Sequence, residues 1–213
     1  MADRTRRQAG TGRDGRNPMT LLGTLLKNRR AGETHLAWNL PNLQAPELLS
    51  VTSQHFEEGG SIPLPLASRL IGGDDRSPHL TWSSPPPETT ELLLVIEDID
   101  VPIGKPAVHC LALIEPSRLV ASSRHVPPGA LSASDSAAGV RVLRSTVGRG
   151  YHGPAPIKGH GPHHYIFQLF ALSSSPDRLL YETASDRTRP RDLLASITAP
   201  VVARGCLTGT YER

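Results

Sequence analysis

The sequence of 213 residues is poor in several features that would identify a function directly. Its two cysteines, Cys110 and Cys206, lie far apart in the chain and form no C-x-x-C motif, so neither a redox dithiol nor a zinc ribbon is expected. No apolar run approaches the length of a membrane-spanning helix, and we expect no membrane span. We interpret the cysteines as reduced, mostly buried thiols of a cytosolic protein.

The motifs of common enzymes are also missing. The sequence has no G-x-x-x-x-G-K-[ST] loop, no G-x-G-x-x-G after a predicted strand, no G-x-S-x-G elbow and no H-E-x-x-H. The chain is therefore not an obvious kinase, dehydrogenase or hydrolase, and we expect no cofactor.

Positive charge is concentrated in the first residues of the chain. Residues 1–30 contain eight Arg or Lys and two Asp, a net charge of +6, whereas the remainder contains 15 basic and 18 acidic residues, a net charge of −3. A nucleic-acid-binding protein would spread basic and aromatic residues over its folded surface. We therefore expect no nucleic-acid partner.

The basic segment has two interpretations. Four leucines between residues 21 and 26 fall on one face of a helix and are followed by Lys27, Arg29 and Arg30. Such a segment is typical of an organellar presequence, which makes a mitochondrial location an alternative to the cytoplasm. The other interpretation is a short helix that docks on the domain behind a disordered leader. We assign residues 1–40 to this extension; whether it is removed stays open.

From Leu48 onward, short apolar runs alternate with Pro, Gly and Ser clusters, which indicates a mainly β domain over residues 48–213. Residues 92–96 are continuously apolar, which predicts a strand covered on both faces. Residues 189–197 predict a helix, residues 37–47 a connection, and residues 116–150 a long loop region. The expected strands are 48–53, 79–82, 91–98, 107–115, 163–172 and 203–213.

Two polar interruptions of apolar strands are candidate site residues. Asp98 and Asp100 follow the run 92–96 at a spacing of two, which places both carboxylates on one side if the strand continues. They could bind a ligand or build a strand-ending Asx turn, and both interpretations stay open. His109 stands alone in an apolar strand, where a histidine is more often a satisfied core residue than a functional group.

The stretch 151–172 contains four histidines. In an extended chain His163 and Tyr165 share one face, whereas His164 points to the other. His152 and His160 lie in a Gly/Pro loop. Zinc needs three or four convergent ligands, and this loop supplies two at most, so we expect no metal. Glycine amides beside histidines are typical of a small anion site.

Four stretches in this order resemble one known family. They are SPHLTWSSPP (77–86), VIEDIDVPIGKPAVHCLALI (95–114), YHGPAPIKGHGPHHYIFQLFAL (151–172) and LTGTYER (207–213). Together they are similar to the phosphatidylethanolamine-binding proteins, in particular the bacterial-type branch that also occurs in fungi. The resemblance covers residues 48–213.

The resemblance implies a mainly β fold, with a central antiparallel sheet packed on a second, smaller sheet and a few peripheral helices. It also implies a small pocket for a phosphate-like anion or a phosphoethanolamine head group. By position, the residues that would line this pocket are Asp98, His109, Gly153, Pro154, His163 and Tyr165, with Asp100 shaping its wall.

The sequence departs from the family pattern at three positions. Ile99 replaces a proline between the two aspartates, Cys110 replaces a frequent aromatic residue, and His164 replaces the arginine of an H-R-Y motif. The last change removes a fixed positive charge together with any ion pair that it made.

Two functional hypotheses remain. The first is a binding or regulatory module that accepts a small anion or lipid head group and engages a protein partner such as a kinase; a homodimer also stays open. The second is an enzyme that uses Asp98, Asp100, His109 and His163 for acid–base chemistry on a small metabolite, by isomerisation, cyclisation or dehydration.

Overall fold

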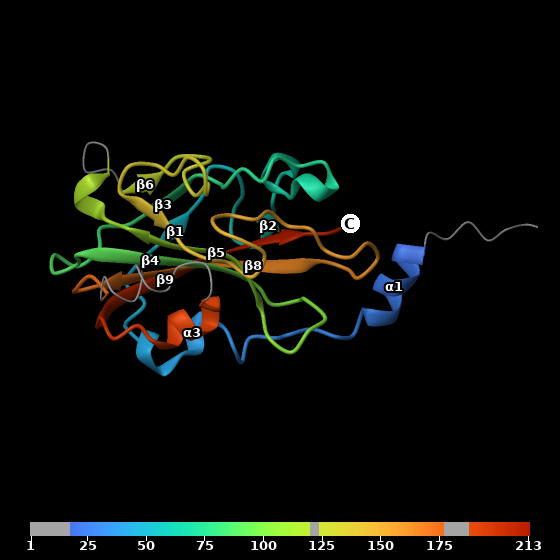
Figure 1. Cartoon of the computed structure of the whole chain (residues 1–213), viewed down its shortest axis with the longest axis horizontal. Coiled ribbons are helices and arrows are strands. Elements are labelled where there is room, and N and C mark those ends of the chain that lie inside the picture. Colours follow the sequence, from blue (N-terminus) through green and yellow to red (C-terminus); the bar gives the residue numbers. More distant parts are fainter. Residues whose placement is uncertain (1–17, 120–123, 177–187) are drawn as a thin grey trace, which may run out of the picture.

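The computed structural model describes residues 18–119, 124–176 and 188–213. Within these ranges two β-sheets dominate, a six-stranded sheet in the order β2-β9-β8-β4-β5-β7 and a three-stranded sheet in the order β1-β3-β6 (Figure 1). The large sheet contains β2 (Gly60–Ser61), β4 (Glu91–Asp98), β5 (Ala107–Ile114), β7 (Val140–Val142), β8 (His163–Leu172) and β9 (Val201–Tyr211). The small sheet contains β1 (Val51–Thr52), β3 (Leu80–Trp82) and β6 (His125–Val126).

The helical elements are short and peripheral. The two α-helices among the described residues are α1 (Pro18–Leu26) and α3 (Pro190–Ala195). The 3₁₀ turns are η1 (Ala37–Asn39), η2 (Pro41–Leu43), η3 (Leu64–Leu66), η4 (Arg69–Ile71) and η5 (Pro116–Arg118). None of the described helices is both long and apolar enough to cross a membrane. The prediction of a mainly β fold with two sheets and few helices is confirmed.

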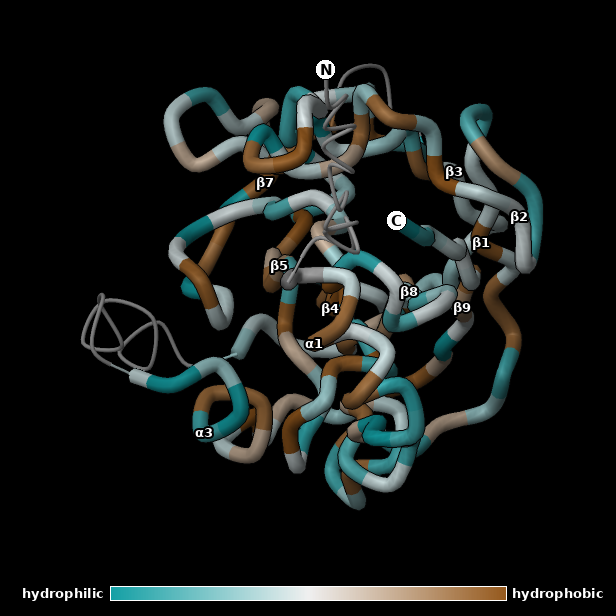
Figure 2. Tube along the Cα trace, turned by 90° about the vertical axis from the view of Figure 1, so that its right-hand side faces the viewer, coloured by the Kyte–Doolittle hydropathy of each residue, from teal (hydrophilic) through white to brown (hydrophobic). Residues whose placement is uncertain are grey.

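Both faces of the large sheet are buried, as the continuous apolar run in β4 predicted. One apolar cluster fills the space between the sheets and includes Phe167 and Trp82. A second cluster lies on the opposite face, where α3 and η1–η2 cover Leu93 and Phe170. Residues 92–96 of β4 and 110–114 of β5 are accordingly apolar, and hydrophobic colour gathers at the centre of the sheet (Figure 2). Every residue of β4 is buried, and this rigid strand fixes the position of Asp98 at its end.

Three sequence predictions need correction. The first strand is Val51–Thr52, shorter than the expected 48–53. The expected loop region 116–150 contains η5, β6 and β7. The expected connection 37–47 is part of the core, since Ala37 and Leu43 are fully buried. Edge strands and 3₁₀ turns are too short to produce a hydrophobic period, which explains these three differences.

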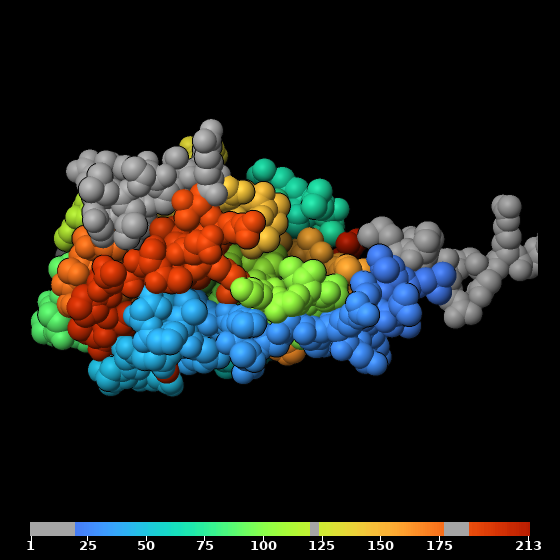
Figure 3. Space-filling model, turned by 60° about the horizontal axis from the view of Figure 1, so that its bottom comes forward, coloured from blue at the N-terminus to red at the C-terminus, as the bar shows by residue number. Residues whose placement is uncertain are grey.

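The N-terminal segment, defined here as residues 18–47, lies along the outside of the domain. Helix α1 stands at the end of the large sheet where β4 ends and β8 begins (Figure 1). From there the chain runs back across the molecule beside the loop after β4 and then past α3 (Figure 3). Gly23 forms the contact between α1 and the loop before β8, whereas the leucines at 21, 22 and 25 are exposed.

Candidate functional site

A β-bulge aims His109 toward the end of β4. Ile96 pairs with Cys110 and Glu97 pairs with Val108, so His109 is an extra residue on β5. Bulges of this kind redirect a side chain and often lie beside functional sites. The His109 backbone carbonyl accepts from the His152 amide at 2.9 Å, and the His109 Nδ1–H donates to the His152 carbonyl at 2.7 Å. These two hydrogen bonds fix the orientation of the His109 ring. Because Nδ1 is the atom bonded to His152, Nε2 points away from His152.

Asp98, His163 and Tyr165 meet beside this bulge. Asp98 pairs directly with Tyr165 across β4 and β8, which places both side chains on one face of the sheet. His163 is the diagonal neighbour, and its Nδ1 lies 2.7 Å from Asp98 Oδ2. Asp98 Oδ1 also accepts from the Asp100 amide at 2.8 Å. Asp98 therefore both builds the Asx turn and contacts a site residue.

His160 continues this group, although the sequence placed it among the loop residues. It is fully buried, and its Nδ1 lies 2.7 Å from His163 Nε2. Its Nε2 donates to the backbone carbonyls of Leu26 at 2.9 Å and Arg29 at 3.1 Å. Asp98, His163 and His160 thus form a hydrogen-bonded chain that ends on the N-terminal segment. Because those carbonyls come from more than 130 residues away in the sequence, no local pattern indicates the contact.

Asp100 belongs to a different group of contacts. Its Oδ1 is paired with the Arg30 guanidinium, and its Oδ2 lies 2.7 Å from His164 Nδ1 and accepts from the His164 amide at 2.6 Å. Arg30 also donates to the Pro162 carbonyl at 3.0 Å. Although burial favours the neutral acid, these hydrogen bonds hold the pKa of Asp100 below its usual value. Asp100 therefore fastens the N-terminal segment to the start of β8.

Gly153 and Pro154 form a wall rather than a set of free donors. The Gly153 amide donates to Asp75 Oδ1 at 2.8 Å, and the Pro154 carbonyl accepts from the Ser68 amide at 2.9 Å. A Cβ at position 153 would lie 2.4 Å from the Ala67 carbonyl carbon, so the close approach of these two backbones requires glycine.

Two groups beside Asp98 are available to a ligand, the Tyr165 hydroxyl and the His109 imidazole. The Tyr165 hydroxyl is buried and makes no hydrogen bond of full geometry among the described residues, although the Asp98 carboxylate and the Ala155 backbone lie close enough to influence it. Burial, together with that carboxylate, raises the pKa of Tyr165. Desolvation lowers the pKa of His109, an effect that Asp98 only partly offsets. A neutral His109 with a proton on Nδ1 presents Nε2 as an acceptor. The two rings lie edge to face, with centroids 5.1 Å apart.

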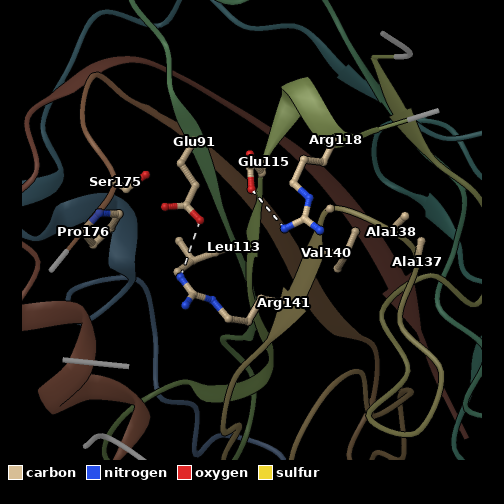
Figure 4. Close-up of a pocket in the computed structure, with 11 residues that line it drawn as sticks. Glu91, Leu113, Glu115, Arg118, Ala137, Ala138, Val140, Arg141, Ser175 and Pro176 are labelled. Atoms are coloured by element: carbon tan, nitrogen blue, oxygen red, sulfur yellow. Dashed lines mark ion pairs between the residues drawn. The ribbon is translucent and has the colours of Figure 1, made fainter. Parts of the chain in front are cut away.

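The structure also contains two cavities away from these residues. One of about 650 Å³ lies at the opposite end of β4, where Glu91 faces Arg141 and Glu115 faces Arg118 (Figure 4). A second, of about 330 Å³, lies between the loop after β4 and the start of α3. Across the described ranges, no three His, Cys, Asp or Glu side chains converge as metal ligands would.

The geometry defines a two-sheet β-protein with a small Asp/His site where three neighbouring strands meet. Residues 52–212 match the family model described as phosphatidylethanolamine-binding protein, and the chain belongs to that family. This confirms the resemblance found in the sequence.

Individual proteins show the same relationship. The chain is 29% identical over 200 residues to phomoidride biosynthesis cluster protein B of a fungal species, an alignment that covers 90% of this chain and 92% of that protein. It is 30% identical over 170 residues to a UPF0098 protein of Aquifex aeolicus, covering 78% and 90%. The crystal structure of E. coli YbcL, described as a member of the mammalian PEBP family, has the same fold, with a TM-score of 0.63 at 24% identity over 78% of this chain and 98% of that one.

Proposed function

We propose that the site at the end of β4 binds a small phosphate-like group, with the phosphoethanolamine head group as the best-fitting form. The observation that carries this proposal is the buried hydroxyl of Tyr165, which lies beside Asp98 and His109 and makes no hydrogen bond of full geometry among the described residues. Leaving a buried hydroxyl without a partner costs about 1–3 kcal/mol, a cost that a bound ligand would remove. Membership of the phosphatidylethanolamine-binding family supports the same ligand class.

The chemistry of the site favours a ligand that carries its own hydrogen-bond donors. Asp98 and Nε2 of a neutral His109 accept hydrogen bonds, whereas the Tyr165 hydroxyl can donate one. An ammonium group, or a protonated phosphate oxygen, would pair with the acceptors. A second phosphate oxygen would accept from Tyr165. Phosphoethanolamine should therefore bind more tightly than inorganic phosphate.

The test is a titration of the full chain with phosphate and with phosphoethanolamine, followed by NMR of the histidine side chains. We expect saturable shifts at His109 and His163, and their loss in His163→Ala. Tyr165→Phe should weaken binding about tenfold, the equivalent of one hydrogen bond.

Tyr151→Phe is the matched control, because its buried hydroxyl is already bonded to the Leu66 carbonyl at 2.9 Å. This variant should lose about 1 kcal/mol of stability and keep its affinity. Tyr165→Phe should lose affinity and, without ligand, gain stability, because it removes a buried hydroxyl that lacks a full hydrogen bond. An absence of shifts at millimolar concentrations of both compounds would refute the proposal.

Acid–base catalysis on a small metabolite is the second candidate. The chain is similar over most of its length to a protein named for a biosynthesis cluster, and a histidine held by a carboxylate is a common acid–base arrangement. Consumption of a metabolite from a cell extract by the wild type, but not by His163→Ala, would favour this function over simple binding. The kinase partner implied by the resemblance and the cytoplasmic location inferred from the cysteines stay predictions.

A further inference from the structure

We propose that Asp98, His163 and His160 form a proton-binding chain that is complete only when residues 18–32, the first part of the N-terminal segment, are docked, so that docking takes up one proton. This inference concerns the segment, and it stands whether or not the site binds a phosphate group. It rests on the hydrogen-bond geometry of three buried side chains and on the two carbonyl groups that end the chain.

The number of protons follows from the partners. The chain contains three consecutive hydrogen bonds, from Asp98 to His163, from His163 to His160, and from His160 to the carbonyls of Leu26 and Arg29. Each bond needs one proton. An ionised carboxylate and two neutral imidazoles carry two protons between them, since each neutral ring has one N–H. The docked arrangement therefore requires a third proton, which makes one ring an imidazolium beside the Asp98 carboxylate.

Undocking removes this requirement. Carbonyl oxygens only accept, so a docked His160 must carry a proton on Nε2. When the segment leaves, water replaces the carbonyls, and water can donate to an unprotonated Nε2. The undocked chain is then fully hydrogen-bonded with two protons. The difference between the two states is one proton.

The other contacts of the N-terminal segment need no additional proton. Arg30 pairs with Asp100, and the Gly32 amide donates to the Ile99 carbonyl at 2.8 Å. The titratable groups that face the chain include His109 on β5, Tyr165 on β8, Tyr211 on β9, which pairs directly with His163, and the Asp100–Arg30 pair, which also contacts His164. Within the described ranges His164 is another histidine bonded to a carboxylate that the segment touches, so a variant at this position is needed as a control.

The sign follows from linkage. A state that binds one more proton is favoured at low pH, and its equilibrium constant falls tenfold for each pH unit once the free state has lost that proton. Docking of residues 18–32 should therefore weaken as pH rises through the range in which histidines titrate, from roughly pH 6 upward. The segment would then leave the His160 side of the site exposed.

The experiment is hydrogen exchange of the full chain, followed by mass spectrometry on peptides from residues 20–36 between pH 5.5 and 8.5. After correction for the intrinsic pH dependence of exchange, protection in the wild type should fall about tenfold per pH unit in the upper part of this range. Asp98→Asn is the decisive variant. Its Oδ1 can accept from the Asp100 amide while its Nδ2–H donates to His163 Nδ1, so the docked chain is satisfied by two ring protons. Its protection should be independent of pH.

Two further variants serve as controls. Arg30→Gln should reduce protection by the same factor at every pH and keep the slope, because it removes an ion pair outside the chain. His164→Gln should also keep the slope. A flat profile in the wild type, a slope that persists in Asp98→Asn, or a slope lost in His164→Gln would each overturn the proposal. The wild-type and His164→Gln results decide the matter even if Asp98→Asn does not fold.

Discussion

Glu97 and Asp98 are consecutive residues of β4, and they point to opposite faces of the same sheet. Both carboxylates are buried, and the contacts of both lead to the N-terminal segment. Their partners differ. Glu97 Oε2 accepts from the Ala37 amide at 2.7 Å and from Gln168 Nε2 at 2.8 Å, and its Oε1 accepts from Arg191 Nη2 at 2.6 Å. Asp98 is bonded to an imidazole and lies beside a hydroxyl that makes no hydrogen bond of full geometry among the described residues.

Glu97 is therefore a structural carboxylate, whereas Asp98 is the carboxylate of the proposed binding site. The donors around Glu97 keep their protons throughout the neutral range, so the cluster holds one arrangement. Gln168 and Arg191 extend this cluster, since Gln168 accepts from the Trp38 amide at 2.6 Å and Arg191 donates to the Pro106 carbonyl at 2.6 Å. The partner of Asp98 is an imidazole, a group that can either donate or accept at each ring nitrogen according to its protonation. The N-terminal segment is thus fastened permanently on the Glu97 face and conditionally on the Asp98 face.

Removing Glu97 should have the largest effect on stability. Glu97→Ala leaves the partly buried Arg191 guanidinium, the Ala37 amide and the Gln168 amide without their acceptor. Breaking a buried charge pair in this way costs about 3–5 kcal/mol. Urea denaturation should show this loss, while the exposed Glu88→Ala control should change stability by less than about 0.5 kcal/mol. Equal stability of the two variants would mean that the Glu97 cluster does not hold the fold.

The sequence predicts the Asp98 face of the large sheet much better than the Glu97 face. The apolar run 92–96 predicts a doubly covered strand, and strand parity correctly places His163 and Tyr165 together and His164 apart. These predictions succeed because a strand repeats every two residues, so a short local pattern determines which side chains share a face.

The remaining features of the site depend on contacts between distant parts of the chain. The bulge that redirects His109 appears only in the pairing of β4 with β5. The role of His160 depends on Leu26 and Arg29, and that of Glu97 depends on Ala37 and Arg191. Position 164 carries no arginine, but the Asp100 carboxylate that His164 contacts is paired with Arg30 from the N-terminal segment. Such pairings leave no periodic signal in a single sequence.

A smaller effect concerns the pH dependence of stability. Burial raises the pKa of Glu97 above its usual value of 4.5, and its hydrogen bonds and Arg191 offset part of this rise. A carboxylic acid whose pKa is higher in the folded state binds its proton more tightly there. The protonated Glu97 therefore contributes fully to stability below pH 4.5, and this contribution is lost as pH rises through the folded-state pKa. Glu97→Gln should remove this fall from the curve of unfolding free energy against pH. Glu91, whose pKa burial also raises, keeps its own contribution in both proteins, so the difference between the curves isolates Glu97. An unchanged curve would contradict the assignment.

The smallest effect, and the one that tests the docking of α1 most directly, is expected at Gly23. In an exposed helix, replacing glycine by alanine adds about 1 kcal/mol of helix stability. In this structure a Cβ at position 23 would lie 2.2 Å from the Lys158 carbonyl oxygen, so the same change should expel the helix from its position. Gly23→Ala should therefore lower hydrogen-exchange protection in residues 20–26 and leave the global unfolding free energy within about 0.5 kcal/mol. Thr24→Ala is the control. Because Thr24 lies on the exposed side of the helix, this change introduces no clash and should not lower the hydrogen-exchange protection of residues 20–26. The sign of the change decides the question: a docked helix loses protection, because the clash outweighs the gain in helix propensity, whereas an undocked helix gains it.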